Sequence, residues 1–160
     1  MRRRWFLTLT LLHALALPCM AAMVFEVHCT GDQSTPPNLS LGVADGTFTL
    51  DDGGTQMAFS LSFVGLEGTT VAAHLHRVST GTGAPIALGL NPPIGVFAGT
   101  CTGTLTGITP AMVTDMLADL YYVNIHTTAF PDGEIRGGLF LRSTTPGKRT
   151  TWGRIKASYR

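Results

Sequence analysis

The feature that most constrains the fold of this 160-residue chain is the pattern of residues 121–141. Apolar and polar residues alternate along two short runs, and Pro-Asp-Gly at 131–133 separates the runs. Alternation with a period of two is typical of β-strands, in which successive side chains point to opposite faces. The segment therefore predicts a β-hairpin, because Asp-Gly accepts the positive φ angles of tight turns.

The two faces of this predicted hairpin differ in chemistry. In the second strand, Glu134 and Arg136 share one face and Ile135 points the opposite way. In the first strand, one face is apolar and consists of Tyr121, Val123 and Ile125. The other face is mixed and consists of Tyr122, Asn124 and His126. We expect the apolar face to lie in a protein core and the mixed face to carry any binding chemistry.

Short alternating runs, interrupted by Gly, Pro and Asp, also fill the region before the hairpin. The clearest covers 57–64, where Met57, Phe59, Leu61 and Phe63 alternate with small or polar residues. The Asp-Asp-Gly-Gly sequence at 51–54 predicts a second hairpin turn. The predicted strands are 23–29, 46–51, 57–64, 71–78, 86–90, 102–107, 121–126 and 134–142.

One helix is expected just before the C-terminal hairpin. Thr109 is a suitable N-cap residue, and Pro110 suits the first helical position. An apolar stripe with helical spacing follows, formed by Met112, Val113, Met116, Leu117 and Leu120. Many short strands with one short helix predict an all-β fold, an antiparallel immunoglobulin-like sandwich or barrel, in a single domain over 23–142.

The first 22 residues have the character of an export signal. Three arginines precede an apolar run over 5–17, and small residues follow at 21–22. The apolar run is shorter than the roughly 20 residues that a transmembrane helix needs. We therefore expect an exported chain, periplasmic or extracellular, with no transmembrane segment after signal removal. Ordinary secretion, twin-arginine export and an N-terminal anchor remain alternatives.

Charge is unevenly distributed along the chain. Residues 23–141 hold ten carboxylates and two arginines, a net charge of −8, whereas residues 142–160 hold six basic residues and no acid. We expect residues 143–160 to form a disordered basic tail that contacts anionic surfaces, the acidic domain, or no partner. The acidic domain argues against nucleic-acid binding.

Two cysteines, Cys29 and Cys101, remain once the predicted signal and its Cys19 are removed. An even pair in an exported chain is consistent with a disulfide. The alternatives are buried thiols and metal ligands, and the sequence leaves all three open.

Four histidines follow the predicted signal, and two of them form a His-Leu-His sequence at 74–76. Residues i and i+2 of a strand face the same side, so His74 and His76 can address one ion, with His126 as a third ligand. Copper or zinc is the expected metal. Hydrogen bonding of these histidines to neighbouring groups is the alternative, with Asn124, Glu134 and Arg136 as partners and a Glu134–Arg136 ion pair. His28 is a weaker candidate, and no catalytic motif is evident.

Three segments resemble the CHRD (chordin-type) domain family. They are Tyr-Val-Asn-Ile-His-Thr at 122–127 with Gly-Glu-Ile-Arg-Gly at 133–137, the Ala-His-Leu-His of 73–76, and the expected helix at 109–119. The resemblance covers about residues 24–142, but the segment 31–37 keeps only the glycine and the prolines of the usual Gly-x-x-Glu-Val-Pro-Pro. It implies an exported binding or structural module at the cell envelope. Within this module, the last hairpin is locked to the His-Leu-His strand by Asn124, His126, Glu134 and Arg136. A looser likeness, to copper-zinc superoxide dismutase, rests on the histidines and Arg136.

Overall fold

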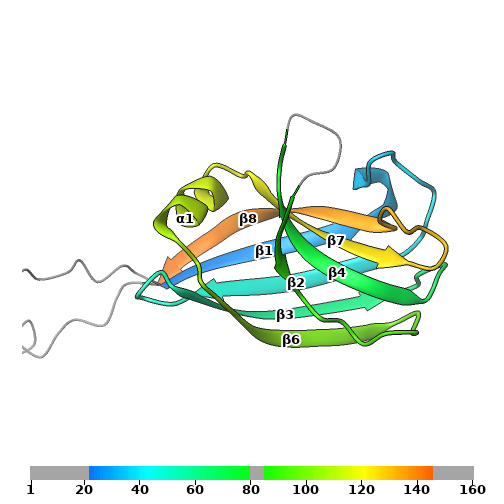
Figure 1. The fold of residues 1–160 in the computed structure, drawn as a ribbon, viewed down its shortest axis with the longest axis horizontal. Coiled ribbons are helices and arrows are strands. Elements are labelled where there is room, and N and C mark those ends of the chain that lie inside the picture. Colours follow the sequence, from blue (N-terminus) through cyan, green and yellow to red (C-terminus); the bar gives the residue numbers. More distant parts are fainter. Residues whose placement is uncertain (1–21, 80–84, 146–160) are drawn as a thin grey trace, which may run out of the picture.

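The computed structural model describes residues 22–79 and 85–145, with side chains described up to residue 142. Within these residues, eight antiparallel strands form one sheet that curls into a nearly closed barrel (Figure 1). The strands are β1 (Ala22–Thr30), β2 (Val43–Leu50), β3 (Gln56–Val64), β4 (Thr70–Arg77), β5 (Ile86–Gly89), β6 (Gly99–Thr106), β7 (Tyr121–Thr127) and β8 (Ile135–Thr145). Their order in the sheet is β5-β4-β7-β8-β1-β2-β3-β6. The predicted all-β fold with one short helix is confirmed, in its barrel form.

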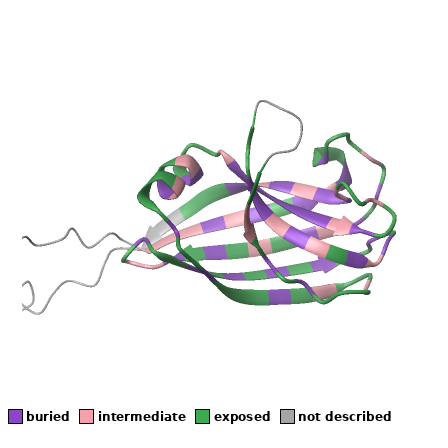
Figure 2. Cartoon of the chain, viewed as in Figure 1, coloured by how far each residue is buried: buried purple, intermediate pink, exposed green. Residues whose placement is uncertain are grey.

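The interior of the barrel is filled by the inward half of each alternating strand (Figure 2). In β3, Met57, Leu61 and Phe63 are almost fully buried, and every second residue between them is exposed. Each large apolar side chain that is fully buried contributes roughly 1.5–3 kcal/mol to folding. The predicted alternation of this strand is therefore confirmed. In β7, Tyr121, Val123 and Ile125 line the core as predicted, but Tyr122 and Asn124 on the other face are buried as well.

Glycines in β6 face phenylalanines in β3. The ladder pairs Gly99 with Phe63 and Gly103 with Phe59, and a Cβ added to Gly103 would lie 2.9 Å from the Phe59 ring. The aromatic rings thus occupy the space that side chains on β6 would need. We predicted that β6 starts at residue 102, but it starts three residues earlier. Glycine is typical of turns, but here Gly99 lies within the strand and pairs with Phe63.

The helix α1 (Pro110–Leu117) lies near one end of the barrel (Figure 1). The Oγ1 atom of Thr109 accepts a hydrogen bond from the backbone N–H of Met112 at 3.2 Å, which confirms the predicted N-cap. Val113 and Met116 are buried in the core, whereas Leu117 is exposed. The predicted apolar stripe is therefore wider than the helix face that packs against the barrel.

At the opposite end of the barrel, the carboxylate of Glu134 is completely buried. One oxygen accepts hydrogen bonds from the Ser40 hydroxyl at 2.6 Å and the Glu67 backbone N–H at 2.7 Å. The other accepts from the Thr127 hydroxyl at 2.7 Å and the Gly68 backbone N–H at 3.2 Å. Glu134 therefore joins the β7–β8 turn to the segment before β2 and to the β3–β4 loop.

The strand β8 continues beyond the predicted domain boundary. Residues 143–145, which we predicted to be the start of a disordered tail, pair with Ala22–Val24 of β1. Backbone pairing overrides the polar composition of this short stretch, so the domain extends to Thr145. Residues 1–21 of the predicted signal and residues 146–160 of the predicted tail lie outside the described residues. Among the described residues, no helix has the length and apolar character needed to cross a bilayer.

We predict that Glu134→Ala strongly destabilises the barrel. The change leaves two backbone N–H groups and two hydroxyls without their acceptor, at roughly 1–3 kcal/mol for each donor that stays unsatisfied. We expect the free energy of unfolding to fall by about 3 kcal/mol or more in urea denaturation. Glu67→Ala is the matched control, because the Glu67 side chain is exposed and its backbone N–H is kept. Equal stability of the two variants would contradict this role of Glu134.

Candidate metal-binding site

The structure brings His74, His76 and His126 together on the outer face of the barrel. His74 and His76 lie on β4, where they alternate with the buried residues Ala73 and Leu75. The neighbouring strand β7 supplies His126, whose Cα pairs with that of Ala72. One ring nitrogen from each histidine lies within 4.8 Å of the others. The cluster therefore has the composition and compactness of a three-histidine metal site.

The β7–β8 turn fixes the ring of His126. Its Nδ1 atom lies 2.8 Å from the carbonyl oxygen of Pro131. Because a carbonyl can only accept, Nδ1 carries the proton and Nε2 of the neutral ring keeps its lone pair. Nε2 faces the cluster and lies 3.2 Å from Nδ1 of His74. A backbone carbonyl that orients a histidine in this way is typical of the groups that support metal ligands.

The second histidine, His76, is held by stacking. Its ring lies nearly parallel to that of Tyr122, with 5.1 Å between centroids and 9° between planes. The guanidinium carbon of Arg136 lies 3.6 Å from the centroid of the same Tyr122 ring. Cation–π and stacking contacts of this kind contribute about 0.5–1.5 kcal/mol each. Tyr122 thus connects Arg136 to the histidine cluster through contacts of its ring.

The environment of His74 favours its neutral form. Burial is the main cause of the lowered pKa of His74. The positive charges that His126 and His76 can carry lower this pKa further. Metal ions bind the neutral imidazole, so protons compete weakly for this ring near neutral pH.

The predicted hairpin residues have separate partners. The Nδ2 group of Asn124 donates to the carbonyl oxygen of Asp132 at 3.1 Å, and the Asn124 amide fills the space above Gly133. Arg136 donates to the Thr35 hydroxyl at 2.7 Å. The Glu134–Arg136 ion pair that we considered is wrong, because Glu134 turns into the barrel end while Arg136 stays on the outer surface.

The remaining candidate ligands lie elsewhere. His28 is on β1, where its Nδ1 atom lies 2.7 Å from a carboxylate oxygen of Asp45. Cys29 and Cys101 are free, buried thiols, so the disulfide considered from the sequence is not formed. Two strands, β2 and β3, separate their strands in the sheet. Burial raises the pKa of both thiols, with the charge of Asp45 adding to the effect at Cys29.

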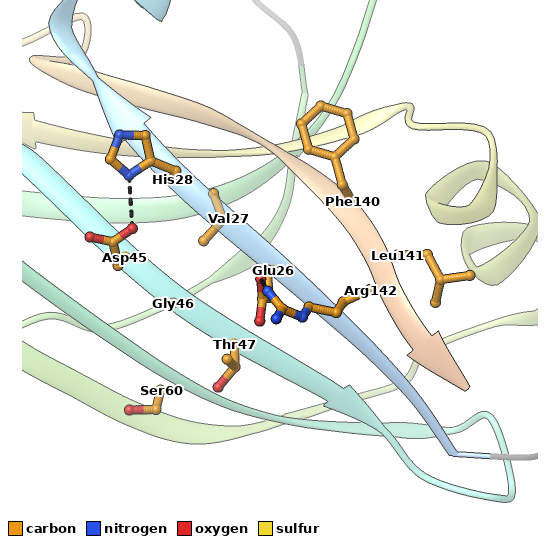
Figure 3. Close-up of a pocket in the computed structure, with 10 residues that line it drawn as sticks. All are labelled: Glu26, Val27, His28, Asp45, Gly46, Thr47, Ser60, Phe140, Leu141 and Arg142. Carbon is orange, nitrogen blue, oxygen red and sulfur yellow. Dashed lines mark hydrogen bonds and ion pairs between the residues drawn. The ribbon is translucent and has the colours of Figure 1, made fainter. Parts of the chain in front are cut away.

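A second surface feature is a groove of about 700 Å³ on the outer face of β8, β1 and β2 (Figure 3). Two polar pairs line it: a hydrogen bond between His28 and Asp45 at 2.7 Å, and an ion pair of Arg142 with Glu26 at 2.6 Å. The exposed ring of Phe140 stands beside them. Sequence reasoning missed this groove, because only the pairing of β1 with β2 and β8 brings these side chains together.

These observations define the protein as an all-β barrel that carries a cluster of three histidines on its outer face. The family model described as "CHRD domain" matches residues 25–139, which include every strand that carries the cluster. The chain belongs to the CHRD-domain family, as its hairpin motif predicts. Searches of curated proteins and of solved structures found no significant match.

We predict that the metal-free protein loses stability as the pH falls below about 6.5, the ordinary pKa of histidine. The folded state lowers the pKa of His74, so between the folded and unfolded pKa values the unfolded chain binds more protons. Stability is therefore full above the unfolded pKa and decreases as the pH falls toward the folded pKa. Urea denaturation at neutral and mildly acidic pH checks this, and His74→Gln should reduce the dependence. An unchanged dependence would rule out His74 as its source.

Proposed function

We propose that this protein is an exported CHRD module that binds one copper or zinc ion through His74, His76 and His126. The observation that supports the proposal is the convergence of the three imidazoles within 4.8 Å. Two neighbouring strands supply them, so the sheet itself holds the donors in place. A signal-like N-terminus and the family resemblance support the export component.

The donor set suits these metals. Imidazole nitrogen is a preferred ligand of zinc and copper, whereas calcium and magnesium prefer oxygen ligands. The Pro131 carbonyl already directs a lone pair of His126 into the cluster, so this donor needs no change of tautomer. Three protein ligands leave room for a further ligand such as water, as in many zinc sites with three protein ligands.

We predict that zinc or copper(II) stabilises the wild-type protein and that His126→Ala abolishes this effect. At a free metal concentration of about 100 times Kd, binding adds about 2.7 kcal/mol to the free energy of unfolding. Isothermal titration and thermal denaturation measure it on the untagged mature chain. In the metal-free state, His126→Ala should cost only about 1 kcal/mol, the value of one hydrogen bond.

The chain offers a matched control, His28→Ala. His28 is an exposed histidine on a different pair of strands, so its removal should leave metal stabilisation unchanged. Two results would refute the metal site: no metal stabilisation of the wild type, or equal metal stabilisation of the His126→Ala and wild-type proteins. Several kcal/mol lost by metal-free His126→Ala, without any metal effect, would assign the histidines to the fold.

The groove in Figure 3 favours a second function, recognition of a partner at the cell envelope. It places an exposed aromatic ring beside the Arg142–Glu26 ion pair and the hydrogen-bonded His28–Asp45 pair, so polar groups are already oriented for hydrogen bonding. The basic segment after residue 142 is the other surface that could hold the protein at an envelope. The two surfaces respond differently to salt, because contacts of a basic segment with anionic polymers are screened.

We predict that the double variant Phe140→Ser, Arg142→Ser releases the protein from isolated envelopes, whereas deletion of residues 146–160 does not. The deletion keeps the whole of β8. Fractionation of cells that express the full-length chain, followed by washing at low and high salt, measures retention. Retention that depends on the deleted segment and is lost at high salt would instead assign binding to the basic tail.

A further inference from the structure

Within the described residues, the strand β6 is a long edge strand of the sheet. It pairs with β3 along its whole length of eight residues, and it is the last strand in the sheet order. The other edge strand, β5, has only four residues, and its pairing with β4 is interrupted by a register shift. A long regular edge presents a row of backbone N–H and C=O groups that can pair with another strand.

The backbone of β6 is open at its centre. Gly103 is exposed, and because glycine has no side chain, its exposed surface is backbone. The Phe59 ring covers the inward side of Gly103, which leaves the outer side and the edge. Near the start of the strand, Pro93 approaches Gly99, whereas most residues of 100–106 are exposed.

Nothing in β6 protects the edge against association. Natural edge strands are commonly guarded by lysine, proline or a bulge. The sequence of residues 100–106, Thr-Cys-Thr-Gly-Thr-Leu-Thr, contains no charged residue and no proline, and the β3–β6 ladder has no register shift.

Charge also favours this edge for contact between identical molecules. Residues 23–141 carry a net charge of −8, so two copies repel each other over most of their surfaces. The two strands β3 and β6 contain no charged residue. Two copies that meet along β6 therefore bring together the neutral part of an acidic domain.

The sequence of β6 is suited to pairing with itself. When two copies run antiparallel with Gly103 opposite Gly103, Thr102 faces Thr104 and Thr100 faces Thr106 on the outer surface. On the inner surface Cys101 faces Leu105, and both side chains are buried in their own barrels. Cross-strand pairs of threonines and of apolar residues stabilise antiparallel sheets.

We propose that two copies of this chain associate through β6, antiparallel about a two-fold axis at Gly103, to form a homodimer with one continuous sheet. The interface is isologous, because each strand presents the same groups to the other. The proposal is independent of the metal site, since the histidines lie on β4 and β7.

The test uses the mature full-length chain and measures its mass in solution by sedimentation velocity at roughly 1–100 μM, a range that resolves micromolar dissociation constants. We expect a dimer whose dissociation constant rises at least about tenfold in Thr102→Lys, Thr104→Lys, because like charges then lie opposite each other. The control Thr47→Lys, Thr49→Lys adds the same charge on the central strand β2 and should remain dimeric.

Hydrogen exchange provides a second measurement that does not depend on variants. Amides within residues 100–106 should become more protected as the protein concentration rises, while the β5 amides should not change. A monomer over the whole concentration range would overturn the proposal. A dimer that both lysine variants weaken equally, or that neither variant weakens, would also overturn it. Circular dichroism of each variant shows that the barrel is retained.

Discussion

The buried carboxylate of Glu134 is the interaction on which the site end of the molecule depends. It accepts four hydrogen bonds from three separate segments, and its own backbone N–H donates to Ile125 on β7. The turn that precedes it is therefore fixed relative to the sheet. That turn contains Pro131, whose carbonyl orients His126. A carboxylate without contact to the histidines thus determines where the third imidazole points.

The outer face of β4 and β7 combines two kinds of support. Hydrogen bonds from Asn124 and His126 hold the turn, and stacking of Tyr122 holds His76 and Arg136. Together these contacts order the rings of a cluster in which His76 is buried and His74 and His126 are half-buried.

Much of the fold was predictable because its determinants are local. The alternation of β3, the Thr109 cap and the turn at 131–133 each depend on neighbours in sequence, and the structure confirms all of them. The early start of β6 and the extension of β8 were not predictable. Gly99 and Gly103 are tolerated in a strand only because Phe63 and Phe59 cover them, and residues 143–145 are ordered by pairing with β1.

The sequence by itself determined that His74 and His76 point the same way, because the period of a strand is a local property; it did not determine that Glu134, which precedes β8, turns away from Arg136. It also determined the family, through the hairpin motif. The tertiary structure decided that His126 joins the pair, that His28 does not, and that Cys29 and Cys101 remain apart. Those outcomes depend on the order of strands in the sheet, which distant contacts select and no local pattern encodes.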